Sequence, residues 1–168
     1  MILDCTLRDG GYHTNWEFEP QFVKDLVVTL DKVGVDVIEL GYKSPLRGGK
    51  YKKCNDKFIE NTLEMIPKSK LSFMVDTKDF VVHNKLDYTL IKTNIHKNSI
   101  FNMCRVATTL DFLEYAKEFV RYLHSIGYET TINLVRASLL DASTLQTVIQ
   151  KLDDSDSDVL YFADSFGS

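Results

Sequence analysis

The segment MILDCTLRDGGYHTNW, residues 1–16, sets an apolar run directly before a run rich in reactive side chains. Its first part, Ile2 to Thr6, is typical of a buried strand. The second part, Leu7 to Trp16, contains an arginine, an aspartate, a histidine and the adjacent glycines Gly10 and Gly11. Adjacent glycines allow a sharp turn and a close approach of the backbone to a ligand. We therefore expect Leu7 to Trp16 to form an active-site loop between the first strand and the first helix.

The rest of the chain alternates between short strand-like runs and longer amphipathic runs. The expected strands are residues 2–6, 35–40, 71–75, 101–107, 129–135 and 159–163. The expected helices are residues 19–33, 55–66, 84–92, 110–126 and 142–152. Because each helix carries the chain back to start the next strand in the same direction, this alternation predicts a parallel sheet built from βαβ units.

Two α/β architectures share this alternation, a doubly wound open sheet and a TIM (β/α)₈ barrel. Barrel enzymes collect reactive side chains at the carboxyl ends of all their strands, whereas an open sheet concentrates its ligands at one switch point. Each of the six expected strands ends in polar or charged residues, namely Arg8 and Asp9, Glu39, Asp76, Arg105, Asn133 with Arg136, and Asp164. The pattern favours the barrel and leaves the doubly wound sheet as the alternative.

The length of the chain limits how much of a barrel it can hold. Six strand–helix units fill the 168 residues at about 28 residues each. A complete barrel has eight strands and typically about 250 residues. We therefore expect residues 1–168 to form a single partial barrel domain of about six strands, the amino-terminal portion of a longer catalytic domain.

Composition argues against several classes of partner. The formal net charge is −4, and the acidic and basic residues are interspersed along the chain. No basic stripe suits nucleic acid and no polybasic flank suits a membrane, so we expect neither as a partner. The three cysteines form no CxxC pair, so we expect reduced thiols. No apolar run is typical of a signal peptide or a membrane-spanning helix, so we expect a cytoplasmic location.

Arg8 and Asp9 form a pair that suits metal and anion chemistry. A hard divalent cation prefers carboxylate oxygens, and an adjacent guanidinium can hold a substrate carboxylate or stabilise an enolate oxygen. A surface salt bridge in a glycine turn is the alternative on residue types alone.

The string DCTLRDGG, Asp4 to Gly11, resembles the D-x-T-L-R-D-G signature of the DRE-TIM metallolyases. This superfamily of metal-dependent (β/α)₈ barrels includes 3-hydroxy-3-methylglutaryl-CoA lyase, 4-hydroxy-2-oxovalerate aldolase and the isopropylmalate and homocitrate synthases. Weaker similarity continues at IELGYKS (38–44), RVATTLDFLEYAKEFV (105–120) and FADSFGS (162–168). The resemblance therefore spans essentially the whole chain.

The resemblance implies roles for individual residues. Asp9 matches the metal-ligating aspartate, and Arg8 matches the arginine that polarises the substrate carbonyl and stabilises the enolate. Glu39 matches a carboxylate near the metal. Tyr12 stands at the position of the catalytic histidine of the aldolase branch, and His13 lies one residue beyond it, so both are candidates for the general base. The other expected pocket residues are Gly10, Gly11, Asp76, Arg105, Asn133, Asp164 and Ser165, of which Asp164 and Ser165 also match a superfamily motif.

The metal site implied by the resemblance is incomplete in this sequence. The superfamily supplies two further ligands from an H-x-H pair after the seventh strand, and the four histidines here contain no such spacing. We therefore expect the chain to offer one strong protein ligand of three and to hold Mn²⁺ or Mg²⁺ weakly.

The resemblance implies a metal-dependent aldolase or lyase in the parent protein, with this chain alone inactive. The substrate would be a 2-oxo-4-hydroxyacid, cleaved to pyruvate and an aldehyde through a metal-stabilised enolate. One alternative is an acyl-CoA condensing transferase, and another is a non-catalytic barrel module of a larger biosynthetic protein. Open strand edges also predict a homo-oligomer.

Lys43 and Arg47 lie in a long polar stretch after the second expected strand. We interpret them as part of a solvated basic loop, with binding of a substrate phosphate or carboxylate as the alternative. Trp16 and Phe18 could act as a lid over the site or pack on the first helix.

Overall fold

A computed structural model describes residues 1–46 and 54–164 and contains a six-stranded parallel sheet. Its strands are β1 (Leu3–Asp4), β2 (Val37–Tyr42), β3 (Lys70–Asp76), β6 (Met103–Thr108), β7 (Glu129–Val135) and β8 (Val159–Ala163). They lie in the order β1-β2-β3-β6-β7-β8, which is their order along the chain. A doubly wound sheet would reverse its order at a switch point, so this sequential order identifies a curled half-barrel. The predicted partial (β/α)₈ barrel is confirmed.

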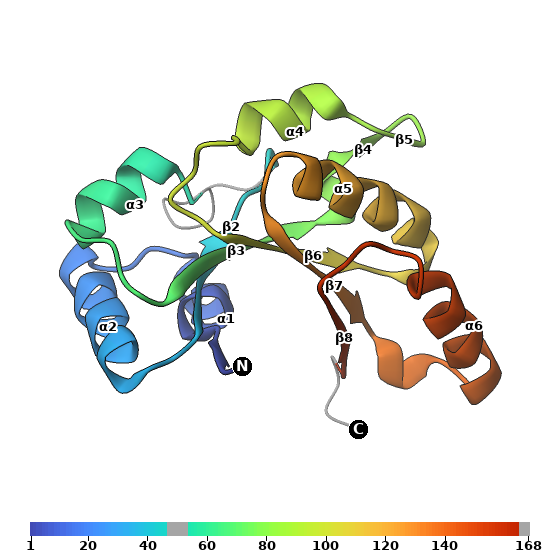
Figure 1. Cartoon of the computed structure of the whole chain (residues 1–168), viewed down its shortest axis with the longest axis horizontal. Helices are drawn as coiled ribbons and strands as arrows, with labels where there is room; N and C mark the ends of the chain where they lie inside the picture. The colour runs from blue at the N-terminus through green and yellow to red at the C-terminus, as the bar shows by residue number, and fades with distance from the viewer. Residues whose placement is uncertain (47–53, 165–168) are drawn as a thin grey trace.

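Five helices cover the outside of the curled sheet (Figure 1). They are α2 (Pro20–Val33), α3 (Asp56–Leu63), α4 (Tyr88–Asn94), α5 (Leu113–Ser125) and α6 (Ala142–Leu152). Local sequence sets several of their ends. The Asn55 side chain accepts a hydrogen bond from the Phe58 amide at the start of α3, and Gly34 ends α2 with a φ of 83°. Among the described residues, no helix is long and apolar enough to cross a membrane.

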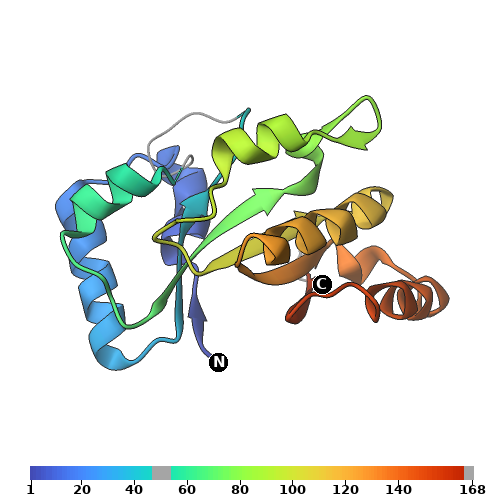
Figure 2. The same ribbon diagram turned by 45° about the horizontal axis from the view of Figure 1, so that its top comes forward.

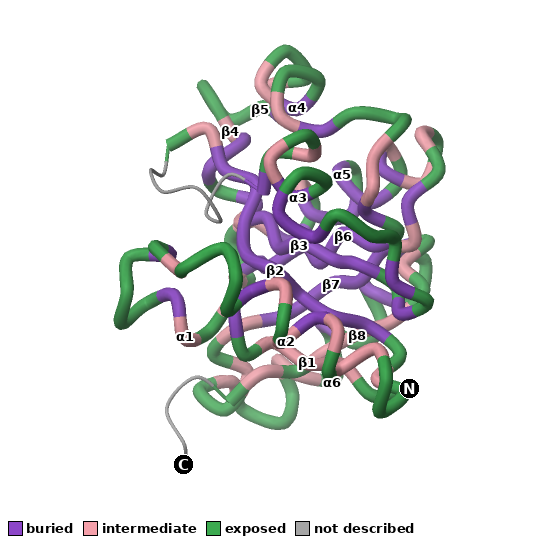
Figure 3. The backbone as a smooth tube through the Cα atoms, turned by 90° about the vertical axis from the view of Figure 1, so that its left-hand side faces the viewer, coloured by how far each residue is buried: buried purple, intermediate pink, exposed green. Residues whose placement is uncertain are grey.

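The two faces of the sheet differ in chemistry because side chains alternate along each strand. The outer face is apolar and packs against the helices through residues such as Ile38, Phe73, Val106 and Ile132, all fully buried. The inner face carries Glu39, Ser72, Arg105, Thr131 and Asn133, which are also buried. Figure 3 shows that burial is concentrated in the central strands, whereas β1 and β8 at the two edges are only partly buried. The half-barrel thus has an apolar outer layer and a polar lining.

The structure corrects the expected start of the chain. β1 covers Leu3–Asp4 only, and residues Thr6–Thr14 form a helix, α1, where a loop was expected. Asn15, in the left-handed conformation with a φ of 53°, ends this helix. The arginine, the aspartate and both glycines of the opening segment therefore lie on one rigid helix.

Two further segments differ from the expected elements. The helix expected at 84–92 is α4 at Tyr88–Asn94, and it follows a short antiparallel hairpin, β4 (Val81–Val82) and β5 (Lys85–Leu86), beside α4 in Figure 2. The expected helix 110–126 divides into a 3-10 turn, η2 (Leu110–Phe112), and α5. Two other 3-10 turns, η1 (Thr77–Phe80) and η3 (Ala137–Leu139), follow β3 and β7.

Candidate active site

A cavity of about 740 Å³ opens at the carboxyl ends of the strands. Its lining includes seven of the residues expected from the sequence, namely Arg8, Asp9, Tyr12, Asp76, Asn133, Arg136 and Asp164. It also includes Tyr42 and Lys78. Asp76 is the last residue of β3, and Asp164 directly follows β8. The structure therefore brings the predicted rim residues together in one hollow, as the carboxyl face of a barrel does.

Helix α1 decides which of its side chains face this cavity. Residues four apart lie on the same side of a helix, so Arg8 and Tyr12 share one face. Asp9 lies at the border of that face and also lines the cavity. His13 is exposed and is absent from the lining. Of the two candidates for the general base, only Tyr12 is directed to the cavity.

A buried charge cluster fixes Arg8. Its Nε donates to Oε2 of Glu39 at 2.8 Å, and its Nη1 donates to Oδ1 of Asp9 at 2.8 Å. Arg105 Nη1 donates to the same Glu39 oxygen at 2.8 Å, and its guanidinium stacks 4.8 Å from the ring centre of Tyr161. Burial by itself would lower the pKa of Arg8, but the Glu39 carboxylate outweighs it and raises that pKa above its usual value. Arg8 is thus permanently charged, and Glu39 fixes its side chain from the interior of the half-barrel.

Glu39 and Arg105 lie deeper than expected from the sequence. Both point from the interior of their strands into the inner layer of the half-barrel, and neither lines the cavity. Their positions at strand ends were expected from residue order, whereas the strands extend past them to Tyr42 and Thr108. Oε1 of Glu39 and Nε of Arg105 are buried and have no hydrogen-bond partner within residues 1–46 and 54–164. These two residues support Arg8 and do not reach the cavity themselves.

The carboxylates at the cavity suit a hard cation but do not form a complete site. The side chain of Asp9 is 66% exposed, so its carboxylate is accessible from the cavity. Asp164 also lines the cavity and accepts a hydrogen bond from Ser138 Oγ at 2.8 Å. Within the part of the chain that the structure describes, no group of three or more His, Cys, Asp or Glu side chains is placed to hold a metal ion. The donor chemistry fits Mn²⁺ or Mg²⁺, with further ligands required.

Comparison with known proteins finds aldolases and a decarboxylase among the relatives of this chain. No protein-family model matches the chain. It is 25% identical to 4-hydroxy-2-oxovalerate aldolase 2 of Mycolicibacterium smegmatis over 99% of this chain and 47% of that protein. It is 23% identical to oxaloacetate decarboxylase of Mycobacterium tuberculosis over its whole length and 48% of that protein. The chain thus spans about half the length of the curated relatives it matches.

A solved structure agrees with these relatives. The N-terminal domain of a proposed aldolase from Bacteroides vulgatus superposes with a TM-score of 0.74 at 25% identity, covering 95% of this chain and 52% of that one. The resemblance to the DRE-TIM metallolyases is confirmed.

The two glycines of the metallolyase signature do not have the roles expected from the sequence. Both lie within α1, neither has a positive φ, and neither lines the cavity. A Cβ on Gly11 would lie 2.3 Å from the Trp16 indole, whereas a Cβ on Gly10 would meet no atom within 4 Å. The absence of a side chain at Gly11 therefore leaves room for the buried Trp16 ring and not for a ligand. Trp16 is 3% exposed and packs against Gly11 of α1, which precedes the helix expected at 19–33, so it does not act as a lid.

Lys43 was expected in a solvated loop and is instead buried at 2% exposure. Its Nζ donates to Asp56 at 3.1 Å and lies over the rings of Phe73 and Phe101 at 4.7 and 4.9 Å. These partners come from distant segments, so the local polar composition gave no sign of them. Arg47 and Ser165 lie outside the described residues.

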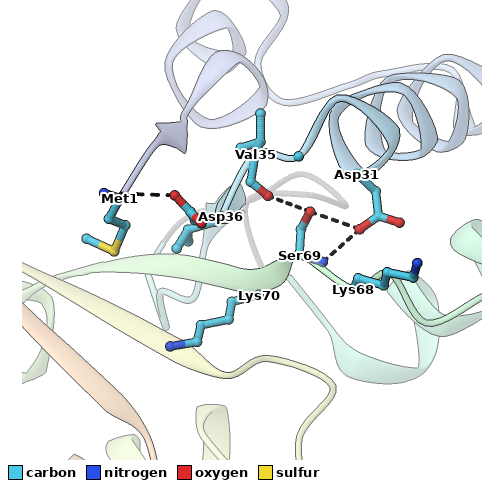
Figure 4. A pocket seen from close by; sticks show the side chains of 9 residues that line it. Met1, Asp31, Val35, Asp36, Lys68, Ser69 and Lys70 are labelled. Atoms are coloured by element: carbon cyan, nitrogen blue, oxygen red, sulfur yellow. Dashed lines mark hydrogen bonds and ion pairs between the residues drawn. The ribbon is translucent and has the colours of Figure 1, made fainter.

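A second cavity, of about 620 Å³, opens at the opposite rim, where β2 and β3 begin (Figure 4). Its acidic side chains are engaged within the fold. Asp31 accepts hydrogen bonds from the amide and hydroxyl of Ser69 at 2.7 and 2.9 Å, and Asp36 accepts from the Ile2 amide at 2.6 Å. The amino-terminal face of a barrel generally serves stability. The reactive side chains of the half-barrel are therefore concentrated at the other rim.

Proposed function

We propose that the chain is the amino-terminal half of a divalent-metal-dependent aldolase that cleaves a 4-hydroxy-2-oxoacid to pyruvate and an aldehyde. The observation that carries the proposal is the position of Arg8 and Asp9. They line a cavity at the carboxyl rim, and Glu39 and Arg105 hold Arg8 from the interior. The aldolases among the relatives support the same reaction class.

Arg8 supplies the positive charge that the reaction requires. Breaking the bond between C3 and C4 releases an electron pair that moves through C2 to the 2-oxo oxygen, producing an enolate. A guanidinium already in place beside that oxygen stabilises the developing charge without reorganisation. Because two bonds of 2.8 Å tie Arg8 to Glu39 and Asp9, its position is fixed before the substrate arrives. Arg8 is therefore proposed to bind the oxyanion.

Arg105 sets the net charge of the cluster. The formal charges of Arg8 and Arg105 offset those of Glu39 and Asp9, so the four groups together are neutral. Without Arg105 the same group would carry one negative charge and would repel an enolate. We infer that Arg105 keeps the cavity suitable for an anion.

The carboxylate of Asp9 is proposed to hold the cation, with Asp164, which lines the same cavity, as a second oxygen donor. A bound Mn²⁺ or Mg²⁺ would polarise the 2-oxo group of the substrate. The pocket residues Asp76 and Asn133 are proposed to shape the remainder of the substrate site.

The test uses the whole protein of which this chain is proposed to be the amino-terminal half. Pyruvate release from 4-hydroxy-2-oxovalerate is measured with lactate dehydrogenase and NADH in the presence of Mn²⁺ or Mg²⁺. Arg8→Gln removes a donor to the oxyanion and is expected to lower kcat by about 10²–10³. Asp9→Asn is expected to raise the Mn²⁺ concentration needed for half-maximal rate, whereas Asp153→Asn, at an exposed position outside the cavity, serves as the matched control. An unchanged half-maximal Mn²⁺ concentration in Asp9→Asn would refute the metal assignment.

Decarboxylation of oxaloacetate is the second candidate, favoured by the mycobacterial relative of that name. Loss of carbon dioxide from oxaloacetate also leaves a pyruvate enolate, so Arg8 would have the same role. The same assay with oxaloacetate separates the two reactions. Turnover of neither substrate would favour a non-catalytic barrel module.

We also propose that the isolated chain associates with itself. β1 and β8 each pair with one strand of the described sheet, and Phe162 on β8 is 43% exposed. Unpaired strand edges readily pair with another chain. Light scattering at tens of micromolar would contradict this proposal if it gave the mass of a monomer.

A further inference from the structure

Two tyrosine hydroxyls meet at the edge of the cavity. The hydroxyl oxygens of Tyr12 and Tyr42 are 2.7 Å apart, so one donates a hydrogen bond to the other. Both residues line the cavity together with Arg8 and Asp9. Tyr12 is 57% exposed and accessible to a substrate, whereas Tyr42 is 4% exposed and lies behind it. The pair is therefore an accessible phenol supported by a buried one.

The placement of Tyr42 depends on an irregularity in β2. Glu39 pairs with Ser72 and Tyr42 pairs with Met74, so three steps along β2 match two steps along β3. In a regular strand, residues three apart point to opposite faces. The extra residue is a bulge that directs both Glu39 and Tyr42 to the inner side, and bulges of this kind often re-aim a side chain beside an active site.

An aromatic cluster fixes the orientation of both phenols. The ring of Trp16 packs edge to face on Tyr12 and Tyr42, with ring centres 4.6 and 5.7 Å apart. Its Nε1 donates to the backbone oxygen of Arg8 at 3.0 Å. Trp16 thus sets the position of the Tyr12 hydroxyl relative to Arg8. If Tyr12 only filled space, its hydroxyl would not need a hydrogen bond to Tyr42 or the packing of Trp16 on both rings.

We propose that Tyr12 is the acid–base residue of the aldol reaction and that Tyr42 is the positioning residue for its hydroxyl. This inference rests on the proposed function. Tyr12 lines the cavity beside Arg8 and Asp9, whereas His13 is absent from its lining. An accessible hydroxyl on the cavity-facing side of α1 can exchange a proton with a substrate bound at Arg8.

The proton balance is simplest in the direction of aldol addition. C3 of the pyruvate enolate attacks the aldehyde carbon, the new carbon–carbon bond forms, and the carbonyl π pair moves to the aldehyde oxygen. The Tyr12 hydroxyl transfers its proton to that oxygen, which becomes the C4 hydroxyl of the product. The phenolate left on Tyr12 accepts a hydrogen bond from Tyr42. Cleavage is the reverse: the Tyr12 phenolate accepts the proton of the C4 hydroxyl as the bond between C3 and C4 breaks. Tyr12 then returns this proton to C3 of the enolate, which gives pyruvate and regenerates the phenolate.

Four variants of the whole protein test this proposal. In Tyr12→Phe, kcat for 4-hydroxy-2-oxovalerate cleavage is expected to fall by about 10²–10⁴, the usual contribution of a general acid or base. In Tyr42→Phe, which removes one hydrogen bond to Tyr12, we expect a loss of about tenfold in kcat with little change in KM. Tyr12→His replaces the phenol by another proton-transfer group and is expected to recover most of the activity lost in Tyr12→Phe. Tyr88→Phe, whose phenol bonds Glu118 on the outer surface, is the matched control and is expected to match wild type.

A second measurement separates catalysis from folding. Calorimetric binding of pyruvate in the presence of Mn²⁺ is expected to be unchanged in Tyr12→Phe, because the proposed proton transfer is not part of pyruvate binding. A Tyr12→Phe protein that turns over within about threefold of wild type would overturn the proposal. A loss in His13→Ala as large as that in Tyr12→Phe would also overturn it. Absence of turnover in wild type would refute the proposed function itself, and the role of Tyr12 with it, so the two failures are distinguishable.

Discussion

Replacing the adjacent glycines of α1 one at a time separates helix propensity from tertiary packing. Gly10 and Gly11 are interior residues of the same helix, so alanine at either position gains about 1 kcal/mol in helix propensity. At Gly10 the new methyl group meets no atom within 4 Å. At Gly11 it would lie 2.3–2.5 Å from three atoms of the Trp16 indole. Because Trp16 is only 3% exposed, the ring cannot move aside freely.

The difference between the two variants therefore measures the steric clash alone. Overpacking of this kind costs about 1–3 kcal/mol. Gly10→Ala is expected to unfold at a higher urea concentration than wild type, and Gly11→Ala is expected to be less stable than Gly10→Ala by that amount. For a domain of this size, the difference corresponds to about 2–4 °C in Tm per kcal/mol.

Trp16 is the single tryptophan of the chain, so its fluorescence reports directly on the clash. Displacement of the ring in Gly11→Ala is expected to shift its emission to the red, whereas Gly10→Ala is expected to leave it unchanged. Urea unfolding followed by circular dichroism gives the free energies, and fluorescence gives the environment. Equal stability and equal emission in the two variants would refute the packing described for α1.

Three further changes are expected to have defined effects on stability. Hydrogen bonds from Ser69 lower the pKa of Asp31, so the folded state gains stability above the usual aspartate pKa of about 3.9, and this gain is lost as the pH falls through the lower folded value. Asp31→Asn should therefore flatten the fall in unfolding free energy below about pH 4, measured in urea, and an unchanged slope would contradict this. Arg105→Met leaves the fully buried Glu39 with Arg8 as its remaining cationic partner and is expected to cost about 3 kcal/mol by urea unfolding, so a cost below about 1 kcal/mol would refute a structural role for the pair. Asp87→Ala removes the cap that accepts from the Thr89 and Leu90 amides at the start of α4 and is expected to cost about 1 kcal/mol by the same measurement, with unchanged stability as the opposing result.

The sheet could be predicted from sequence because its signals are local. Strands such as VLYFA at 159–163 and the amphipathic helix before Gly127 can each be recognised from a few neighbouring residues. The alternation of strands and helices along the chain then predicts the parallel order of the sheet. The rim positions of Asp76 and Asp164 follow directly from the ends of those runs. The predictions for these strands and rim residues agree with the structure because they depend on local sequence alone.

The parts that could not be predicted depend on contacts between distant segments. The glycines of α1 indicate a loop, yet the packing of Trp16 on Gly11 and the ion pair between Arg8 and Glu39 hold the segment as a helix. The orientation of Tyr42 depends on a bulge that alternation along β2 does not reveal. Lys43 is buried because Asp56 and Phe101 converge on it from other elements. In each case, tertiary structure overrides the local pattern.

Anomalous diffraction would show whether Asp9 binds a metal ion at the carboxyl rim. Crystals of the whole protein grown with Mn²⁺ and pyruvate would be measured at a wavelength where manganese scatters anomalously. We expect an anomalous peak within about 2.0–2.5 Å of an Asp9 carboxylate oxygen, with the pyruvate oxygens between the ion and Arg8. A manganese peak away from Asp9, for example beside Asp31 and Asp36 at the opposite rim, would contradict it.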